Sequence, residues 1–237
     1  NFDMYLMPEP AAAASAECGF RTVLTGAVND FTQSVQMLAD WYQTLNRYDP
    51  LISFLPGFHA EYTTSYAILK ELGQLAVSLR APMYMHNSET AREVAGCLAR
   101  YGKTPSALFE ELGIFDYGGG GFHCVYLSDE DLEIFRRHGV YAVTCPAANL
   151  KLASGIAPIA RMLSHGIRVA VGTDGPAGNN ALDLFRELYL VSVLAKHRSF
   201  DAAALDAVQV FGMATVYGAR AMGLAEADCL AVGKLAD

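Results

Sequence analysis

Charged residues are scarce in this sequence, and acidic residues outnumber basic ones. Charged residues make up 18% of the 237 positions, with 17 Lys and Arg against 25 Asp and Glu, which gives a formal net charge of -8. Binding to a phosphate backbone needs clustered positive charge, so we expect no nucleic-acid partner. Because 52% of the residues are hydrophobic, we expect elements buried on more than one face, such as a parallel sheet covered by helices.

Long apolar runs, targeting segments and disulfide-type cysteine patterns are also missing. No apolar run approaches the ~18 residues of a membrane span, and no signal peptide is recognisable, so we expect no membrane partner. The five cysteines are odd in number, widely spaced and without a C-x-x-C pair. This pattern argues against a disulfide framework and favours a reducing cytoplasm. The sequence begins with Asn1 rather than Met, from which we expect a processed or incomplete chain.

Short apolar runs alternate with amphipathic segments, a pattern typical of βαβ units and a parallel sheet. Six runs are predicted to be strands: 22–26, 51–55, 83–86, 122–125, 141–144 and 169–172. Residues 1–5 are predicted to be the end of a seventh strand. Apolar spacing at i, i+3, i+4 predicts helices over 33–46, 65–79, 91–101, 129–138, 159–164, 182–196 and 203–222. An open doubly wound sheet and a (β/α)8 barrel both fit. The absence of G-x-G-x-x-G and G-x-x-x-x-G-K-[ST] removes the best evidence for nucleotide-binding open sheets.

Polar side chains that could form a site fall at or just beyond the ends of predicted strands. His59 follows the second run, and His86 closes the third. The fourth run carries His123, and Asp174 follows the sixth. In parallel α/β folds the carboxyl ends of the strands carry the functional residues. The three other histidines fall on or beside predicted helices.

Each of these residues also has a plain structural interpretation. A single histidine at a strand end is more often a hydrogen-bonding residue than a metal ligand, and Asp174 could be a turn residue before Gly175. Glu89 could be a first-turn residue favoured by a helix dipole. Taken together they favour a site for a metal of borderline-to-hard character, such as Zn or Fe, held by imidazole and carboxylate. Glu89, three residues after His86, could then transfer protons beside a metal-activated water.

Six segments match a known set of motifs in the same order along the chain. They are 58–63 (FHAEYT), 85–90 (MHNSET), 123–127 (HCVYL), 146–155 (PAANLKLASG), 172–180 (GTDG with a later NN) and 232–237 (VGKLAD). This set resembles the amidohydrolase superfamily, in particular its 5'-methylthioadenosine/S-adenosylhomocysteine deaminase group and the chlorohydrolase relatives of that group. Each motif alone is modest, but six in order are specific for the superfamily.

The resemblance implies a (β/α)8 TIM-like barrel over residues 1–237 that is incomplete at both ends. Members of the family begin the metal site with an H-x-H pair on the first barrel strand, and this sequence has no H-x-H. The first strand and the flanking β-sandwich domain are therefore expected to be missing. Since a barrel without one strand exposes two edges, we expect a longer protein and an inactive isolated chain.

The family's chemistry would be hydrolytic deamination of a 6-aminopurine nucleoside, such as methylthioadenosine or S-adenosylhomocysteine, by a metal-activated hydroxide. The resemblance implies that His86 and Asp174 bind the metal, zinc first and iron as an alternative. It implies that Glu89 carries a proton to the ring nitrogen and that His123 hydrogen-bonds the hydroxide or the tetrahedral centre. Asp174 would accept a proton from the attacking water, and His59, with Glu89 and Asp174, would contact the substrate. With two family ligands only, the chain is expected to hold zinc weakly.

Two departures from the family pattern leave alternatives open. The loop after Gly26 lacks the arginines that some members use on the substrate, and Thr144 with Cys145 replaces a frequent His-containing pair. Triazine chlorohydrolase, guanine deaminase and cytosine deaminase therefore remain alternatives. A catalytically inert barrel fragment, because the H-x-H ligands are absent, is a further one. The apolar balance also permits a homo-oligomer.

Overall fold

A computed structural model describes residues 1–235, and the chain divides into two compact units. Unit 1 comprises Asn1–His86 and Ala107–Gly119, and unit 2 comprises Asn87–Ser106 and Gly120–Asp237. Strands alternate with helices, and strands pair in parallel in both units, so the chain is an α/β protein as predicted. The final residues of the 232–237 motif, Ala236 and Asp237, lie outside the described residues.

Unit 1 contains a three-stranded parallel sheet and a separate strand pair. The sheet has the order β1-β2-β3, formed by β1 (Phe2–Met4), β2 (Thr22–Thr25) and β3 (Ile52–Leu55). In the pair, β4 (Gly57–Ala60) runs parallel to β5 (Met83–Asn87), and a parallel bridge joins Val28 to Phe58 in β4. The strand β4 was not predicted. It begins one residue after Pro56, which has no N–H for a ladder and separates it from β3.

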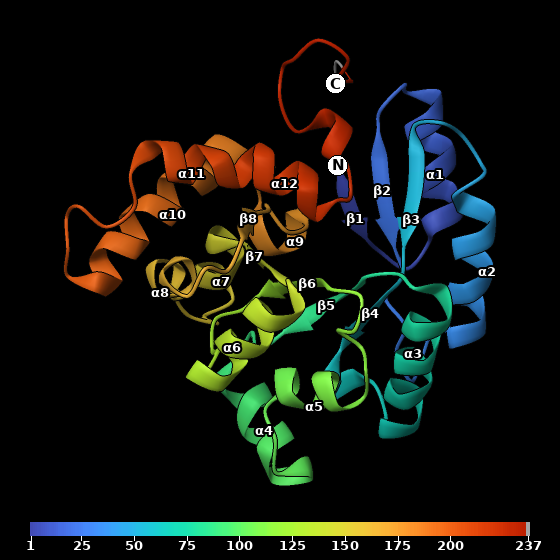
Figure 1. The fold of residues 1–237 in the computed structure, drawn as a ribbon, viewed down its shortest axis with the longest axis horizontal. Coiled ribbons are helices and arrows are strands. Elements are labelled where there is room, and N and C mark those ends of the chain that lie inside the picture. The colour runs from blue at the N-terminus through green and yellow to red at the C-terminus, as the bar shows by residue number, and fades with distance from the viewer. Residues whose placement is uncertain (236–237) are drawn as a thin grey trace. The chain divides into compact units, whose positions relative to one another are not determined.

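The helices of unit 1 include α1 (Pro8–Glu17), α5 (Pro105–Glu111) and the short η1 (Glu61–Thr63), which the sequence pattern did not predict. The others are α2 (Val35–Leu45) and α3 (Tyr66–Leu79), and α5 lies at the boundary between the two units. Helices α1 and α2 lie beside the β1–β3 sheet in Figure 1, and α1 packs on β2 while α2 packs on β3. The sequence of α1 is rich in alanine and has almost no apolar periodicity. Pro8 occupies its first turn, where proline is well tolerated.

Unit 2 contains parallel strands in the order β6-β7-β8, formed by β6 (Gly119–His123), β7 (Tyr141–Thr144) and β8 (Val169–Val171). The sequence has four consecutive glycines at residues 118–121, and the last three of them belong to β6. A Cβ atom at Gly121 would lie 2.9 Å from Sγ of Cys124 and 3.1 Å from Cβ of Asn87. Glycine therefore keeps this strand close to its neighbours.

The helices of unit 2 agree with the predicted bounds in three cases and differ in others. They are α4 (Ala91–Tyr101), α6 (Asp129–His138), α7 (Pro146–Lys151), α8 (Ile159–Ser164), α9 (Pro176–Asn179), α10 (Leu184–Ser199), α11 (Ala207–Ala214) and α12 (Val216–Ala221), followed by η2 (Ala225–Ala227). The helices at 91–101, 129–138 and 159–164 are confirmed. The single helix predicted over 203–222 is wrong, because the backbone breaks at Thr215, with φ -112° and ψ -92°. Helices α10, α11 and α12 all contact β8.

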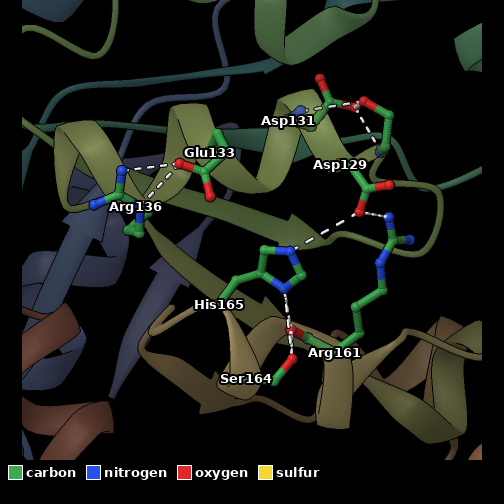
Figure 2. Close-up of polar contacts among 8 residues, drawn as sticks. Asp129, Asp131, Glu133, Arg136, Arg161, Ser164 and His165 are labelled. Carbon is green, nitrogen blue, oxygen red and sulfur yellow. Dashed lines mark hydrogen bonds and ion pairs between the residues drawn. The ribbon is translucent and has the colours of Figure 1, made fainter.

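Charged side chains on α6 form the contacts drawn in Figure 2. Arg161 donates to Asp129, which links α8 to the start of α6, and Arg136 contacts Glu133 at 2.8 Å. The hydrogen bond from Arg161 lowers the pKa of Asp129. Asp129 is 80% exposed, and exposed pairs contribute little stability, so this cluster is a solvated ion-pair network. Across residues 1–235, no helix has both the length and the apolar character needed to cross a membrane.

Candidate active site

The residues predicted for the site fall into two groups, one in each unit. His59 and His86 belong to unit 1, and Glu89, His123 and Asp174 belong to unit 2. Each lies in or just beyond a strand: His59 in β4, His86 in β5, His123 at the end of β6, and Asp174 after β8. The placement of His86, His123 and Asp174 in or beyond the ends of strands is therefore confirmed, whereas His59, predicted to follow the strand at 51–55, lies within the unpredicted strand β4.

The two histidines of unit 1 lie side by side. Their ring centroids are 4.8 Å apart, and Nδ1 of His86 lies 2.8 Å from the backbone oxygen of His59. Because a carbonyl oxygen can only accept, Nδ1 carries the proton, and the lone pair of the neutral ring is on Nε2. This is the tautomer that binds a metal through Nε2, and a backbone carbonyl is a usual partner for a metal-binding histidine. The hydroxyl of Thr63 contacts Nδ1 of His59 at 2.8 Å and holds that ring.

In unit 2, Glu93 fixes the backbone at Glu89. Glu93 is the N3 residue of α4, and Thr90 forms a capping box with it. The Glu93 carboxylate accepts hydrogen bonds from the N–H groups of Ser88 and Glu89 at 2.9 and 2.7 Å. Burial raises the pKa of Glu93, although these backbone hydrogen bonds oppose the rise. The backbone that carries Glu89 is therefore tied to the first turn of a stable helix.

The side chain of Glu89 contacts two further residues of unit 2. Its Oε1 accepts a hydrogen bond from Ser154 at 2.8 Å, and its Oε2 lies 3.9 Å from Nε2 of His123. On the other side of the imidazole, Nδ1 of His123 lies 2.7 Å from Oδ1 of Asn149. The Glu89 side chain is 13% exposed, so the carboxylate stands partly open beside a buried imidazole. The structure thus brings together two residues suited to exchange protons with a substrate.

Asp174 is held in the loop after β8 and contacts its own backbone. The N–H of Gly175 donates to Oδ1 at 2.6 Å, and a Cβ atom at Gly178 would lie 2.8 Å from Oδ2. The buried Glu187 fixes this loop through Asn179. The Nδ2 of Asn179 donates to the carboxylate of Glu187 at 2.9 Å and to the backbone oxygen of Thr173 at 2.6 Å. Buried polar groups therefore fix the backbone next to Asp174, and the N–H of Gly175 holds its carboxylate.

The backbone is strained at three of these turns. Ser88, His123 and Asp174 have φ values of 52°, 67° and 60°, in the left-handed region that non-glycine residues rarely adopt. Such residues gather at functional sites, where the surrounding structure holds them in place. The strain is consistent with these strand ends forming the functional part of unit 2.

Cys145, which with Thr144 stands where the motif pattern often has a His-containing pair, is a buried thiol near acidic groups. Burial raises its pKa most, and the negative charges of Asp174 and Glu187 raise it further. The thiolate is the form that attacks carbon or binds a metal. Cys145 therefore stays protonated and behaves as a small core residue.

The donors expected for a metal are His86 and Asp174, an imidazole and a carboxylate that suit zinc or iron. Within either unit, over the part of the chain that the structure describes, no group of three or more His, Cys, Asp or Glu side chains is placed to hold a metal ion. Catalytic zinc sites use three protein ligands and an open position. Each donor, taken by itself, is of a type that such sites use, and the tautomer of His86 places the lone pair of its ring on Nε2.

Two residues of the unit 2 group were missed by the sequence reasoning. Asn149 and Ser154 lie in the motif at 146–155, which indicated the family but gave neither residue a role. Their contacts join residues 26 and 65 positions apart in the chain. The motif was the one available signal, because contacts at such separations leave no local pattern.

Known proteins resemble this chain over nearly its whole length. The family model described as "Amidohydrolase family" matches residues 8–237. The 5-methylthioadenosine/S-adenosylhomocysteine deaminase of Thermoanaerobacter pseudethanolicus is 40% identical over 243 residues, covering 99% of this chain and 56% of the relative. The 5'-deoxyadenosine deaminase of Methanothermobacter thermautotrophicus is 37% identical over 242 residues, with the same shares. The chain thus spans about half the length of the curated relatives it matches.

Solved structures show the same likeness. An adenosine deaminase from Xanthomonas campestris with bound Zn has a TM-score of 0.91 at 35% identity, covering 98% of this chain and 55% of that one. Guanine deaminase from C. acetobutylicum, with guanine in its active site, has a TM-score of 0.85 at 18% identity, covering 95% of this chain and 57% of that one. At the lower identity the likeness concerns the fold alone.

Proposed function

This chain belongs to the amidohydrolase family, and we propose that the full-length protein is a metal-dependent hydrolytic deaminase of a 6-aminopurine nucleoside such as methylthioadenosine or S-adenosylhomocysteine. The observation that carries the proposal is the contact between Glu89 and His123 in unit 2, an acid–base pair at the carboxyl ends of parallel strands. The names of the relatives at 40% and 37% identity support the substrate class. The fold we propose is the (β/α)8 barrel that the motifs imply, acting on a small molecule in a reducing cytoplasm.

The metal and its ligands are part of the proposal. When bound, a divalent metal, zinc or iron, would supply the positive charge that makes water a nucleophile near neutral pH. His86 and Asp174 are the residues of this chain that would hold it. The proton on Nδ1 of His86, set by the carbonyl of His59, is what makes its Nε2 a donor to a metal.

Glu89 is the residue that delivers a proton to the purine ring. As water adds to the carbon that bears the amino group, negative charge builds on the adjacent ring nitrogen, and a proton from Glu89 neutralises it. Because Ser154 occupies Oε1, the proton is exchanged at Oε2, the oxygen on the side of His123. A positioned acid or base of this kind contributes about 10²–10⁴-fold to the rate.

His123, Asp174 and His59 complete the proposed reaction. With its proton on Nδ1, neutral His123 accepts at Nε2 a hydrogen bond from the attacking water or from the hydroxyl group of the tetrahedral centre. Glu89 takes from the attacking water the proton that it gives to the ring nitrogen, and Asp174 takes the second proton of the water and passes it to the amino group, which leaves as ammonia. His59 contacts the substrate. One water is consumed, and the products are ammonia and the 6-oxopurine nucleoside.

A panel of ring substrates tests this function in the full-length, metal-loaded protein. Methylthioadenosine, S-adenosylhomocysteine, 5'-deoxyadenosine and adenosine are compared with guanine, cytosine and a chlorotriazine by release of ammonia or chloride. We expect turnover of at least one adenosine derivative. Turnover of another ring with none of the adenosine derivatives would contradict the proposed substrate. No turnover, together with a metal content near zero, would support a non-catalytic protein instead.

A further inference from the structure

We propose that Asn149 and Ser154 are positioning residues, and that the single segment 149–154 fixes both members of the Glu89–His123 pair. This inference rests on the proposed function for its kinetic consequence, but its structural part stands on the contacts alone. Each end of the pair has one side chain from this segment against it: Ser154 against the carboxylate, and Asn149 against the imidazole.

Ser154 determines which oxygen of Glu89 is available for proton exchange. The Ser154 side chain is buried, and its hydroxyl donates to Oε1 at 2.8 Å. A carboxylate can turn about its last bond, and this hydrogen bond fixes that turn. Oε2 is thereby held on the side of His123, 3.9 Å from Nε2. Without the hydroxyl, the plane of the carboxylate would turn more freely and the productive geometry would be populated less often.

Asn149 determines which nitrogen of His123 carries the proton. Its Oδ1 lies 2.7 Å from Nδ1 of the ring, and an amide oxygen can only accept, so the proton is on Nδ1. The lone pair of neutral His123 is therefore on Nε2, the nitrogen that faces Glu89. A histidine with the opposite tautomer would present an N–H group there and could not accept a hydrogen bond from water.

The burial of Asn149 indicates that its amide serves orientation rather than stability. Asn149 is 1% exposed, and its Nδ2 has no hydrogen-bond partner within the described residues. A buried donor without a partner costs free energy, which an apolar side chain of similar size would avoid. The interaction that Asn149 makes in return is the hydrogen bond between its Oδ1 and Nδ1 of His123.

The backbone of the segment holds the two side chains in a fixed relation. The N–H of Ser154 donates to the carbonyl oxygen of Asn149 at 2.8 Å, which closes the turn after α7. Ala153 has a φ of 56°, the left-handed conformation that usually takes glycine at the end of a helix. The turn thus places Asn149 and Ser154 together, and movement of one would be transmitted to the other.

Nitrogen-15 NMR of histidine-labelled full-length protein tests the role of Asn149 without any substrate. The signals of His123 are identified by their loss in His123→Gln and recorded at a pH where the ring is neutral. We expect the Nδ1–H tautomer in the unsubstituted protein, its loss in Asn149→Ala, and its retention in Asn149→Asp, which keeps an acceptor oxygen. An Nε2–H tautomer in the unsubstituted protein, or an unchanged tautomer in Asn149→Ala, would overturn the assignment.

Steady-state kinetics test the role of Ser154. We expect Ser154→Ala to lower kcat about tenfold or more with KM changed less than twofold, and Ser154→Thr, which keeps the hydroxyl, to recover most of kcat. Ser164→Ala, which removes an exposed hydroxyl on α8, is the matched control and keeps the unsubstituted kcat. An unchanged kcat in Ser154→Ala overturns the role of Ser154. If no adenosine derivative reacts at all, the proposed function fails, while the NMR result still decides the tautomer of His123.

Discussion

At the scale of single residues, two histidines acquire the same tautomer from different partners. His86 donates its Nδ1 proton to the backbone carbonyl of His59, and His123 donates its Nδ1 proton to the side chain of Asn149. In both rings the lone pair is therefore on Nε2. Sequence reasoning placed both histidines at strand ends but could not supply these tautomers, because they depend on single atoms of residues 27 and 26 positions away.

Glu89→Gln is expected to lower kcat by about 10²-fold or more, because an amide cannot donate and accept a proton as a carboxyl group does. The metal content should remain near that of the unsubstituted protein. Glu130→Gln, an exposed change on α6, is the control. Steady-state kinetics and elemental analysis on the same samples check both statements. Nearly full activity in Glu89→Gln would show that the proton passes through another group.

His86→Ala is expected to lower the metal content of the full-length protein, because it removes an imidazole whose tautomer suits ligation. His197→Ala, an exposed histidine on α10, should leave the metal content unchanged. Elemental analysis after dialysis measures both. Equal metal in the two variants would exclude His86 as a ligand.

At the scale of elements, helices with strong apolar periodicity were predictable and close-packed glycine strands were not. The helices at 91–101 and 129–138 agree to the residue, because capping boxes mark where they begin and glycines where they end. β6 begins at Gly119, within a glycine run that has no strand propensity. An added Cβ atom would meet backbone atoms of Met83 at Gly119 and side-chain atoms at Gly121, which is a tertiary cause that a local pattern cannot show.

Gly119→Ala is expected to destabilise the fold by roughly 2–3 kcal/mol or more, as overpacking and a forbidden φ do. A Cβ atom there would lie 1.9 Å from the carbonyl oxygen of Met83, and φ is 135°. Gly102→Ala is the matched control, since Gly102 has a φ of 66° and no atom within 4 Å of the added Cβ. It should cost only about 1 kcal/mol. Chemical denaturation measures both, and equal losses would contradict the close approach at Gly119.

The capping carboxylate of α4 predicts a pH dependence of stability. Burial raises the pKa of Glu93, so the folded state binds its proton more tightly than the unfolded state does. The contribution of Glu93 to stability is therefore full below the ordinary glutamate pKa and declines as pH rises through the raised pKa. Glu93→Gln does not titrate, so its cost in stability should be greater at low pH than at neutral pH. Denaturation at several pH values checks this, and a cost that grows with pH would contradict it.

At the scale of the whole molecule, the α/β class and the family could be predicted from the sequence. The alternation of strands and helices gave the class, and six ordered motifs gave the family, which the match over residues 8–237 confirms. The roles of His59, His86 and Asp174 in substrate and metal binding remain predictions. They depend on a set of metal ligands, of which this chain carries one imidazole and one carboxylate. The curated relatives that it matches are nearly twice its length.

The most direct test of hydrolytic deamination is the fate of oxygen from labelled water. Full-length, metal-loaded protein is incubated with methylthioadenosine in ¹⁸O-labelled water, and the nucleoside product and ammonia are measured by mass spectrometry and a coupled assay. We expect one labelled oxygen on the purine and one ammonia for each nucleoside consumed, with both products formed about 10²-fold more slowly in Glu89→Gln. A product without labelled oxygen, or consumption of the nucleoside without release of ammonia, would contradict hydrolytic deamination.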